Sequence, residues 1–305
     1  MIHFLEHKSI DKKKWDTCIQ RSANGMVYAT SWYLDVVSPD WNALVAGDYE
    51  AVFPLTWRKK YGFHYLYQPS FTQQLGLFSV AEYSSEKTVQ EFLSAIPERY
   101  RFVEINLNSK NVSTTDNYHT TNRHTHHLDL NEPLETIRNS YSENLKRNVK
   151  RASKFQVTAS SHMKLSEIIK IFKNHKAKFI QPLKKKEYEL LEQIIHEADQ
   201  RSLVTLLGAE TSTGKWCAGA VFLHSFHEYI FLFSAVNEVA RKTGAMSMLI
   251  DHFISLHANE NRLLDFEGSM DKKLARYYQS FGSKEIVYLQ IRKNNLPSYV
   301  RWFKR

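Results

Sequence analysis

Residues 263–269 read Leu263-Leu264-Asp265-Phe266-Glu267-Gly268-Ser269, and residues 273–282 continue as Lys-Leu-Ala-Arg-Tyr-Tyr-Gln-Ser-Phe-Gly. This stretch predicts an apolar strand that ends in two carboxylates, then a glycine turn and a short helix. Strand ends that lead into glycine-containing turns often carry the functional side chains of α/β proteins. We therefore expect a site here, with Glu267 as the more accessible carboxylate and the phenol of Tyr278 beside it.

The segment Arg241-Lys242-Thr243-Gly244-Ala245 is predicted to open an amphipathic helix. A glycine at the start of a helix allows backbone amides to approach a phosphate, and the helix N-terminus adds partial positive charge. We therefore predict that Arg241, Gly244 and Ala245 bind an anionic ligand. The motif is short, and an ordinary helix start is the alternative.

A second basic segment lies in the middle of the chain. Its cations recur at helical intervals of three and four, so one helical face would carry them all: Lys146, Arg147, Lys150, Arg151 and Lys154. Like charges stacked in this way repel one another unless an anion lies across them. The segment therefore predicts a phosphate-binding helix, and a solvated surface helix is the alternative.

Three further groups have both functional and structural interpretations. Asp265 and Glu267, two residues apart on a strand, would share one face and act as a general acid and base, or only orient cations. The loop of residues 68–76, with Gln73 in it, would line a cleft with amide groups or serve as a plain hairpin loop. Four histidines (His119, His124, His126 and His127) invite a metal site, but no Cys lies near them and Thr, Arg and Asn dilute the cluster. We therefore predict a polar edge strand at the domain boundary and no metal there.

The 305 residues suffice for one large or two smaller domains, and a Pro-bearing break at Asn131-Glu132-Pro133 suggests domains 1–133 and 134–305. The formal charge of +9 favours acidic partners without choosing among them. A signal peptide and a long apolar segment are both missing, so a cytoplasmic protein without a transmembrane segment is expected. The basic residues cluster on one helix without a recognisable nucleic-acid reader, which argues against a DNA-binding protein.

Taken together, these segments resemble the Fem-type branch of the GNAT acyltransferase superfamily, which carries two GNAT-like domains in one chain. Tyr28-Ala29-Thr30-Ser31-Trp32 is similar to an early family segment ending in Trp, and Phe53-Pro54-Leu55 to its strand ending in Pro-Leu. The basic helix resembles the one that opens the second domain, and the run from Asp265 to Ser269 with Phe281-Gly282 is the strongest match.

The resemblance implies an α+β fold in which each domain is a mostly antiparallel mixed sheet flanked by helices, the two meeting at a cleft. It implies a transferase that moves an acyl or aminoacyl group to an amine of a phosphate-bearing acceptor, as in cell-wall synthesis. The donor would be an acyl-CoA, an acyl carrier or an aminoacyl-tRNA at Arg241, Gly244 and Ala245, with no tightly bound cofactor. The acceptor, a small or nucleotide-linked molecule, would bind the matching basic positions Lys146, Arg147 and Arg151. Gln73 of the polar loop is a further candidate for acceptor binding, on its residue type and not on the resemblance.

Glu267 would accept the proton of the amine, and Tyr278 would donate one to the leaving group. Two departures from the family pattern support an alternative, an inactive GNAT-like module that binds anions. Met246 stands where the usual pattern has Gly or Ala, and Tyr277-Tyr278 stands where peptidoglycan-bridge members have Phe-Lys. The sequence leaves the donor, the acceptor and the oligomeric state open.

Overall fold

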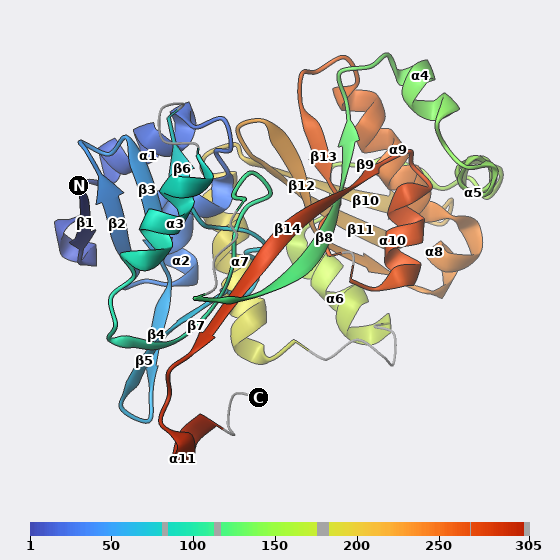
Figure 1. Cartoon of the computed structure of the whole chain (residues 1–305). Coiled ribbons are helices and arrows are strands. Elements are labelled where there is room, and N and C mark those ends of the chain that lie inside the picture. The colour runs from blue at the N-terminus through green and yellow to red at the C-terminus, as the bar shows by residue number, and fades with distance from the viewer. Residues whose placement is uncertain (81–84, 113–116, 176–182, 269, 302–305) are drawn as a thin grey trace. The chain divides into compact units, whose positions relative to one another are not determined.

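The computed structural model describes residues 1–80, 85–112, 117–175, 183–268 and 270–301. The chain divides into two compact units (Figure 1): unit 1 contains Met1–His124 and Val287–Arg305, and unit 2 contains Thr125–Ile286. Ser269 of the motif quoted above lies outside the described residues. Within the described residues, no helix combines the length and the apolar character that crossing a membrane requires.

Unit 1 contains two groups of hydrogen-bonded strands with short helices around them. One sheet has the order β1-β2-β3-β6, and the second group has the order β4-β5-β7-β14, in which β5 and β7 are parallel and the other pairs are antiparallel. The elements of this unit are β1 (Ile2–Leu5), η1 (His7–Ser9), α1 (Lys12–Arg21), η2 (Val27–Ala29), α2 (Ser31–Val37), β2 (Asn42–Ala46), β3 (Ala51–Leu55), β4 (Trp57–Lys60), β5 (Phe63–Tyr67), β6 (Phe78–Ser79), α3 (Glu86–Ser94), β7 (Tyr100–Asn106), most of β14 (Lys284–Asn294) and α11 (Ser298–Arg301).

Unit 2 is built on strands in the order β8-β13-β12-β11-β10-β9. Only β12 and β13 pair in parallel among the described pairs of this unit, and the others are antiparallel. Its elements are the second half of β8 (His119–Asp129), α4 (Leu134–Asn139), α5 (Glu143–Lys154), β9 (Thr158–Ser160), α6 (Leu165–His175), α7 (Lys185–Asp199), β10 (Val204–Glu210), β11 (Trp216–His224), β12 (Glu228–Val236), α8 (Glu238–Thr243), α9 (Ala245–His257), β13 (Leu263–Asp265) and α10 (Lys272–Gln279). The expected mixed, mostly antiparallel α+β fold is confirmed.

The bounds of the two units differ from the domains 1–133 and 134–305 expected from the sequence. The first change of unit falls inside β8, between His124 and Thr125, and the second falls inside β14. The C-terminal segment returns to unit 1 because β14 pairs with β7 from Gln290 to Asn294. A strand pairing between segments this far apart in the chain leaves no signal in local composition.

Aromatic packing forms the core of unit 2 around α9. Phe253 of α9 stacks on Phe222 of β11, with ring centroids 3.7 Å apart and planes within 5° of parallel. Leu249, Ile250 and Ile254 complete the buried face of this helix at the spacing of an amphipathic α-helix. The packing of α9 against the sheet therefore fixes the position of this helix, and with it the position of its N-terminus.

Gly244 joins α8 to α9 and lies against the backbone of α5. Its φ of 78° is in the left-handed region, where it both ends α8 and precedes the first turn of α9. A Cβ at this position would lie 2.5 Å from the carbonyl oxygen of Asn148. Glycine is therefore required here by the close approach of two helices as well as by the turn.

Unit 2 also contains a buried polar cluster on β8, β12 and β13. Asp265 accepts hydrogen bonds from the hydroxyl of Thr125 and from the backbone N–H of Glu267, and Nε2 of His127 lies 3.3 Å from its Oδ2. Oε1 of Glu228 is buried and has no hydrogen-bond partner among the described residues. Burial and the negative charge of Asp265 raise the pKa of Glu228 to about 8, so this carboxyl carries a proton at neutral pH.

The contact between Gly244 and α5 predicts a specific loss of stability. Gly244→Ala adds a backbone clash to an unfavourable φ, and it should lower the free energy of unfolding by roughly 2 kcal/mol or more. Gly268→Ala is the matched control, because its φ is 40° and no atom lies within 4 Å of the added Cβ. Urea denaturation of both variants tests this prediction, and equal losses would show that the contact with Asn148 contributes nothing.

The raised pKa of Glu228 predicts a pH dependence of stability. Between about pH 4.5 and pH 8 the folded chain binds more protons at this group than the unfolded chain does, so stability falls as pH rises. Relative to Glu228→Gln, the free energy of unfolding of the wild-type protein should fall by at most about 1.4 kcal/mol per pH unit as pH rises across this window. Denaturation at both ends of the window measures the difference, with the exposed Glu192→Gln as control. A constant difference between wild type and Glu228→Gln would contradict a protonated Glu228.

Candidate functional site

The sheet of unit 2 opens at the point where β13 ends. The parallel register joins Glu228 to Leu263 and Ile230 to Asp265, and β13 stops there while β12 continues to Val236. The second half of β12, from Phe231 onward, therefore extends past its parallel partner. Side chains and backbone of this half line a pocket of about 500 Å³.

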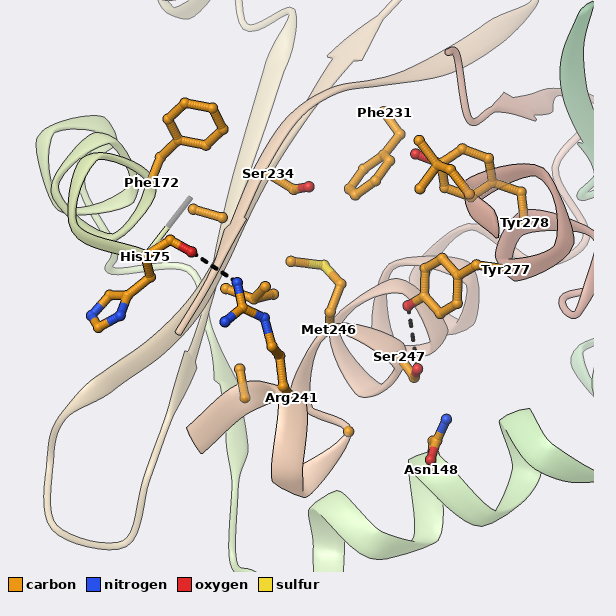
Figure 2. A pocket seen from close by; sticks show the side chains of 15 residues that line it. Asn148, Phe172, His175, Phe231, Ser234, Arg241, Met246, Ser247, Tyr277 and Tyr278 are labelled. Carbon is orange, nitrogen blue, oxygen red and sulfur yellow. Dashed lines mark hydrogen bonds between the residues drawn. The ribbon is translucent and has the colours of Figure 1, made fainter. Parts of the chain in front are cut away.

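The walls of the pocket come from several elements of unit 2 (Figure 2). Beyond β12, they come from α6, from the junction of α8 and α9, and from α10, with one contribution from α5. The lining residues are Asn148, Phe172, His175, Phe231, Ser234, Ala235, Val236, Ala240, Arg241, Gly244, Met246, Ser247, Leu274, Tyr277 and Tyr278. The set is mostly apolar with a few polar groups, which is the usual composition of a small-molecule site.

Arg241 places a cation at one side of this pocket. Its Nη2 donates a hydrogen bond of 2.8 Å to the carbonyl oxygen of His175, and this contact joins α8 to the end of α6. The N-terminus of α9 opens beside it, and no side chain in the described part of the chain caps that terminus. The first backbone N–H groups of a helix lack intrahelical partners. The guanidinium and the α9 N-terminus together make this side of the pocket favourable for an anion.

Two adjacent tyrosines form another wall. The hydroxyl groups of Tyr277 and Ser247 lie 3.2 Å apart, and the ring of Tyr278 stacks on Phe266 with centroids 4.8 Å apart. Burial raises the pKa of both phenols well above the usual range, and for Tyr278 the negative charges of Glu267 and Asp265 add to the effect. Both phenols are therefore neutral at physiological pH, and each can donate a proton or a hydrogen bond.

Glu267 and Asp265 differ from the expectation that they share one face of a strand. β13 ends at Asp265, and Glu267 has a φ of 51°, so its side chain does not follow the alternation of the strand. Asp265 is 1% exposed, whereas Glu267 is half-buried. Glu267 is the more accessible carboxylate, as predicted, and its charge acts on Tyr278. Asp265 instead holds the turn by accepting the N–H of Glu267.

The predicted donor motif is also arranged differently from the sequence expectation. Arg241 lies in the last turn of α8, a short helix that the sequence did not reveal, and α9 begins at Ala245 as predicted. Gly244 lines the pocket, but its missing Cβ makes room for α5, and its N–H is bonded to the carbonyl of Ala240. Ala245 is buried and does not line the pocket. Met246, flagged from the sequence, extends its side chain into the pocket (Figure 2).

The basic helix forms as α5, with Ser142 as its N-cap. Arg147 and Arg151 are exposed, and Lys146 is half-buried and paired with Glu143 at 3.0 Å. None of these three cations lines the described pocket, which α5 reaches through Asn148. Their role in acceptor binding stays a prediction, and any anion on this face would lie outside the pocket itself.

Gln73 belongs to unit 1, whereas the other predicted site residues belong to unit 2. Its side-chain oxygen accepts a hydrogen bond from Gln74, and its backbone carbonyl accepts one from Asn106. Gln68 accepts the N–H of Asn106 in the same loop. The amides of this loop are thus used largely to hold it against β7, and a role for Gln73 in acceptor binding stays a prediction.

Sequence reasoning missed the contribution of α6 to the pocket. Phe172 and His175 are distant in sequence from the C-terminal motifs. A Phe on an amphipathic helix is usually interpreted as a core residue, so the sequence offered no reason to place Phe172 in a site. Ser247 was missed as well, although a serine in the first turn of a helix after a glycine was the available signal.

The group of described residues close enough to hold a metal ion consists of His127, Glu228 and Asp265, with one atom of each within 4.8 Å of the others. His127 therefore does have carboxylate neighbours, which come from other strands and are invisible in its own segment. Nε2 of His127 lies 3.3 Å from Oδ2 of Asp265, and the absence of a metal at this cluster stays a prediction. The expectation of an edge strand for the histidine segment is wrong, because β8 lies between β14 and β13 in the strand order.

No protein-family model and no curated protein matches the chain. Solved structures with similar folds do exist. FemX has a TM-score of 0.70 at 12% identity, over 97% of this chain and 99% of the other. L-PGS from Bacillus licheniformis has a TM-score of 0.54 at 9% identity, and the match covers 95% of this chain and 93% of the other. A conserved protein of unknown function from Bacteroides thetaiotaomicron has a TM-score of 0.55 at 10% identity, and the match covers 96% of this chain and 99% of the other.

These likenesses extend over nearly the whole chain at identities far below those that carry a shared function. They concern the fold. The chain has a fold similar to that of FemX over nearly its whole length.

Proposed function

We propose that the protein is an N-acyltransferase whose donor binds in the pocket of unit 2. The observation that carries the proposal is the junction of α8 and α9 beside the open half of β12. There, Arg241 and the uncapped N-terminus of α9 lie at one side of a pocket whose other wall is Tyr277 and Tyr278. A donor with a phosphate group and an apolar acyl end fits that distribution of charge.

In the proposed reaction, the neutral amine of the acceptor attacks the acyl carbonyl carbon. The new C–N bond forms as the bond from the carbonyl carbon to the leaving sulfur or oxygen breaks. Glu267 takes the proton that the amine loses, and Tyr278 donates a proton to the leaving group. The proton on Glu267 then returns to the phenolate of Tyr278, so each group ends the cycle as it began. The neutral state of Tyr278 supports its role as the proton donor.

The acceptor in this proposal carries a phosphate and binds near the exposed face of α5. Arg147 and Arg151 are exposed on that face, and Asn148 of the same helix lines the pocket. A phosphate on the cationic face would leave the rest of the acceptor within reach of the pocket. A nucleotide-linked amine is the class of acceptor that the resemblance suggests, and acyl-CoA or aminoacyl-tRNA are the classes of donor.

A second candidate function is an anion-binding module without catalysis. Met246 supports it, because its side chain occupies space in the pocket beside the N-terminus of α9. Under this alternative, a donor would bind and raise the melting temperature, but no acceptor would be acylated.

The two candidates predict different results in one set of assays. We expect acyl transfer, followed by mass spectrometry, with a donor from a panel of acyl-CoAs and aminoacyl-tRNAs. Tyr278→Phe and Glu267→Gln should each lower kcat by about 100-fold with donor binding retained. Arg241→Ala should weaken donor binding by roughly tenfold, because it removes a charge-assisted contact.

Lys242→Ala is the matched control, since this neighbouring cation is exposed and does not line the pocket. Thermal shifts measure donor binding independently of turnover. Binding that depends on Arg241 without product from any donor would favour the non-catalytic module. Unchanged turnover in both Tyr278→Phe and Glu267→Gln would disprove the assigned roles.

A further inference from the structure

The hairpin of β4 and β5 in unit 1 carries a concentration of cations and aromatic rings. Residues 57–67 read Trp-Arg-Lys-Lys-Tyr-Gly-Phe-His-Tyr-Leu-Tyr and include no Asp or Glu. The strands pair from Trp57–Leu66 to Lys60–Phe63, so a two-residue turn at Tyr61-Gly62 connects them. Arg58, Lys59 and Lys60 are all exposed.

The tip of this hairpin presents an aromatic ring at an unfavourable backbone conformation. Tyr61 has a φ of 51° and Gly62 a φ of 82°, the pattern of a tight hairpin turn in which Asn and Gly are the ordinary residues. Tyr61 is nevertheless 64% exposed. A large ring is held out into solvent at a site where its backbone is strained, and such a strain points to a function for the side chain.

One face of the hairpin continues into an apolar hollow. The register places Arg58, Lys60, Phe63 and Tyr65 on the same face, and the guanidinium of Arg58 lies 4.1 Å from the centre of the Tyr67 ring. The hollow is lined by Lys60, Tyr61, Phe63, Tyr65, Phe102, Leu296 and Val300. The C-terminal segment 292–301 supplies the last two and also contains no acid, and its Tyr299 is 70% exposed.

Protection of an edge strand accounts for part of this surface only. β4 pairs only with β5 in the strand order, and Lys and Arg on such a strand discourage pairing with other chains. That purpose explains the cations. It does not explain Tyr61 at the tip or Tyr299 beside the hollow, because exposed aromatic rings promote association instead of preventing it.

We propose that the β4–β5 hairpin tip, with the hollow beside it, docks on an anionic lipid surface. Tyrosine rings with an apolar body and a polar hydroxyl are favoured at the level of lipid headgroups, and neighbouring Lys and Arg attract anionic lipids. The hollow offers an apolar lining to hydrocarbon. Nucleic acid is less well matched, because the rings project from a tip and cover a hollow that has one cation, Lys60, among its lining residues.

Vesicle co-sedimentation of the full-length protein tests this surface. The probes are phosphatidylcholine vesicles with and without about 30% phosphatidylglycerol, at about 0.1 M salt. We expect selective binding to the anionic vesicles. Lys59→Ala with Lys60→Ala should weaken it about fivefold for each cation removed. Lys13→Ala with Lys87→Ala, on α1 and α3, removes the same charge from exposed positions and should leave binding nearly unchanged.

Tyr61→Asn separates a role of the ring from a loss of folding. Asn tolerates a positive φ better than Tyr, so this variant should keep or raise the melting temperature while binding the vesicles several-fold more weakly. Equal binding to both kinds of vesicle, or equal losses in the two double variants, would overturn the proposal. Binding to a short RNA that is lost in Lys59→Ala with Lys60→Ala, without vesicle binding, would assign the surface to nucleic acid. The hairpin belongs to unit 1 and the donor pocket to unit 2. The vesicle experiment therefore does not test the proposed acyl transfer, which is tested separately by the transfer assays.

Discussion

The parallel pairing of β12 with β13 is the constraint on which the site of unit 2 depends. Because β13 ends at Asp265, the pairing stops at Ile230, and β12 extends beyond it to Val236. α8 and α9 connect the two strands, and the buried face of α9 fixes where its N-terminus lies. The pocket forms at this opening, so the backbone arrangement creates the space and the side chains then determine what fits into it.

The turn that follows β13 links the sheet to the tyrosine wall. Asp265 is buried and its carboxylate holds the N–H of Glu267, which fixes the turn from which Glu267 extends. α10 then returns Tyr278 onto Phe266. The segment that follows β13 thus links the buried polar cluster to the tyrosine wall of the pocket, and we expect a change at Asp265 to alter the position of Glu267. The cluster therefore serves to position the turn, in agreement with the general dependence of functional side chains on buried supporting contacts.

Local patterns predicted much of this arrangement. The apolar run before Asp265, the glycine after Glu267 and the Gly244-Ala245 pair predicted β13, the turn and the start of α9, since each depends on neighbouring residues alone. Features that require distant segments were not predictable. The carboxylates beside His127 come from other strands, Gly244 is needed because Asn148 lies against it, and β14 returns to unit 1 by pairing with β7. The sequence also gives no signal for the left-handed backbone of Glu267, because this residue is not a glycine. That conformation is the reason why Glu267 and Asp265 do not share one face of a strand.

The most direct test of the account is a crystal structure of the protein with a hydrolysis-resistant acyl donor analogue. We predict that the phosphate of the analogue contacts Arg241 and the N-terminus of α9, with its carbonyl group within hydrogen-bond reach of the Tyr278 hydroxyl. If the analogue binds elsewhere and the pocket beside β12 stays empty, the central claim that this opening of the sheet is the donor site is contradicted.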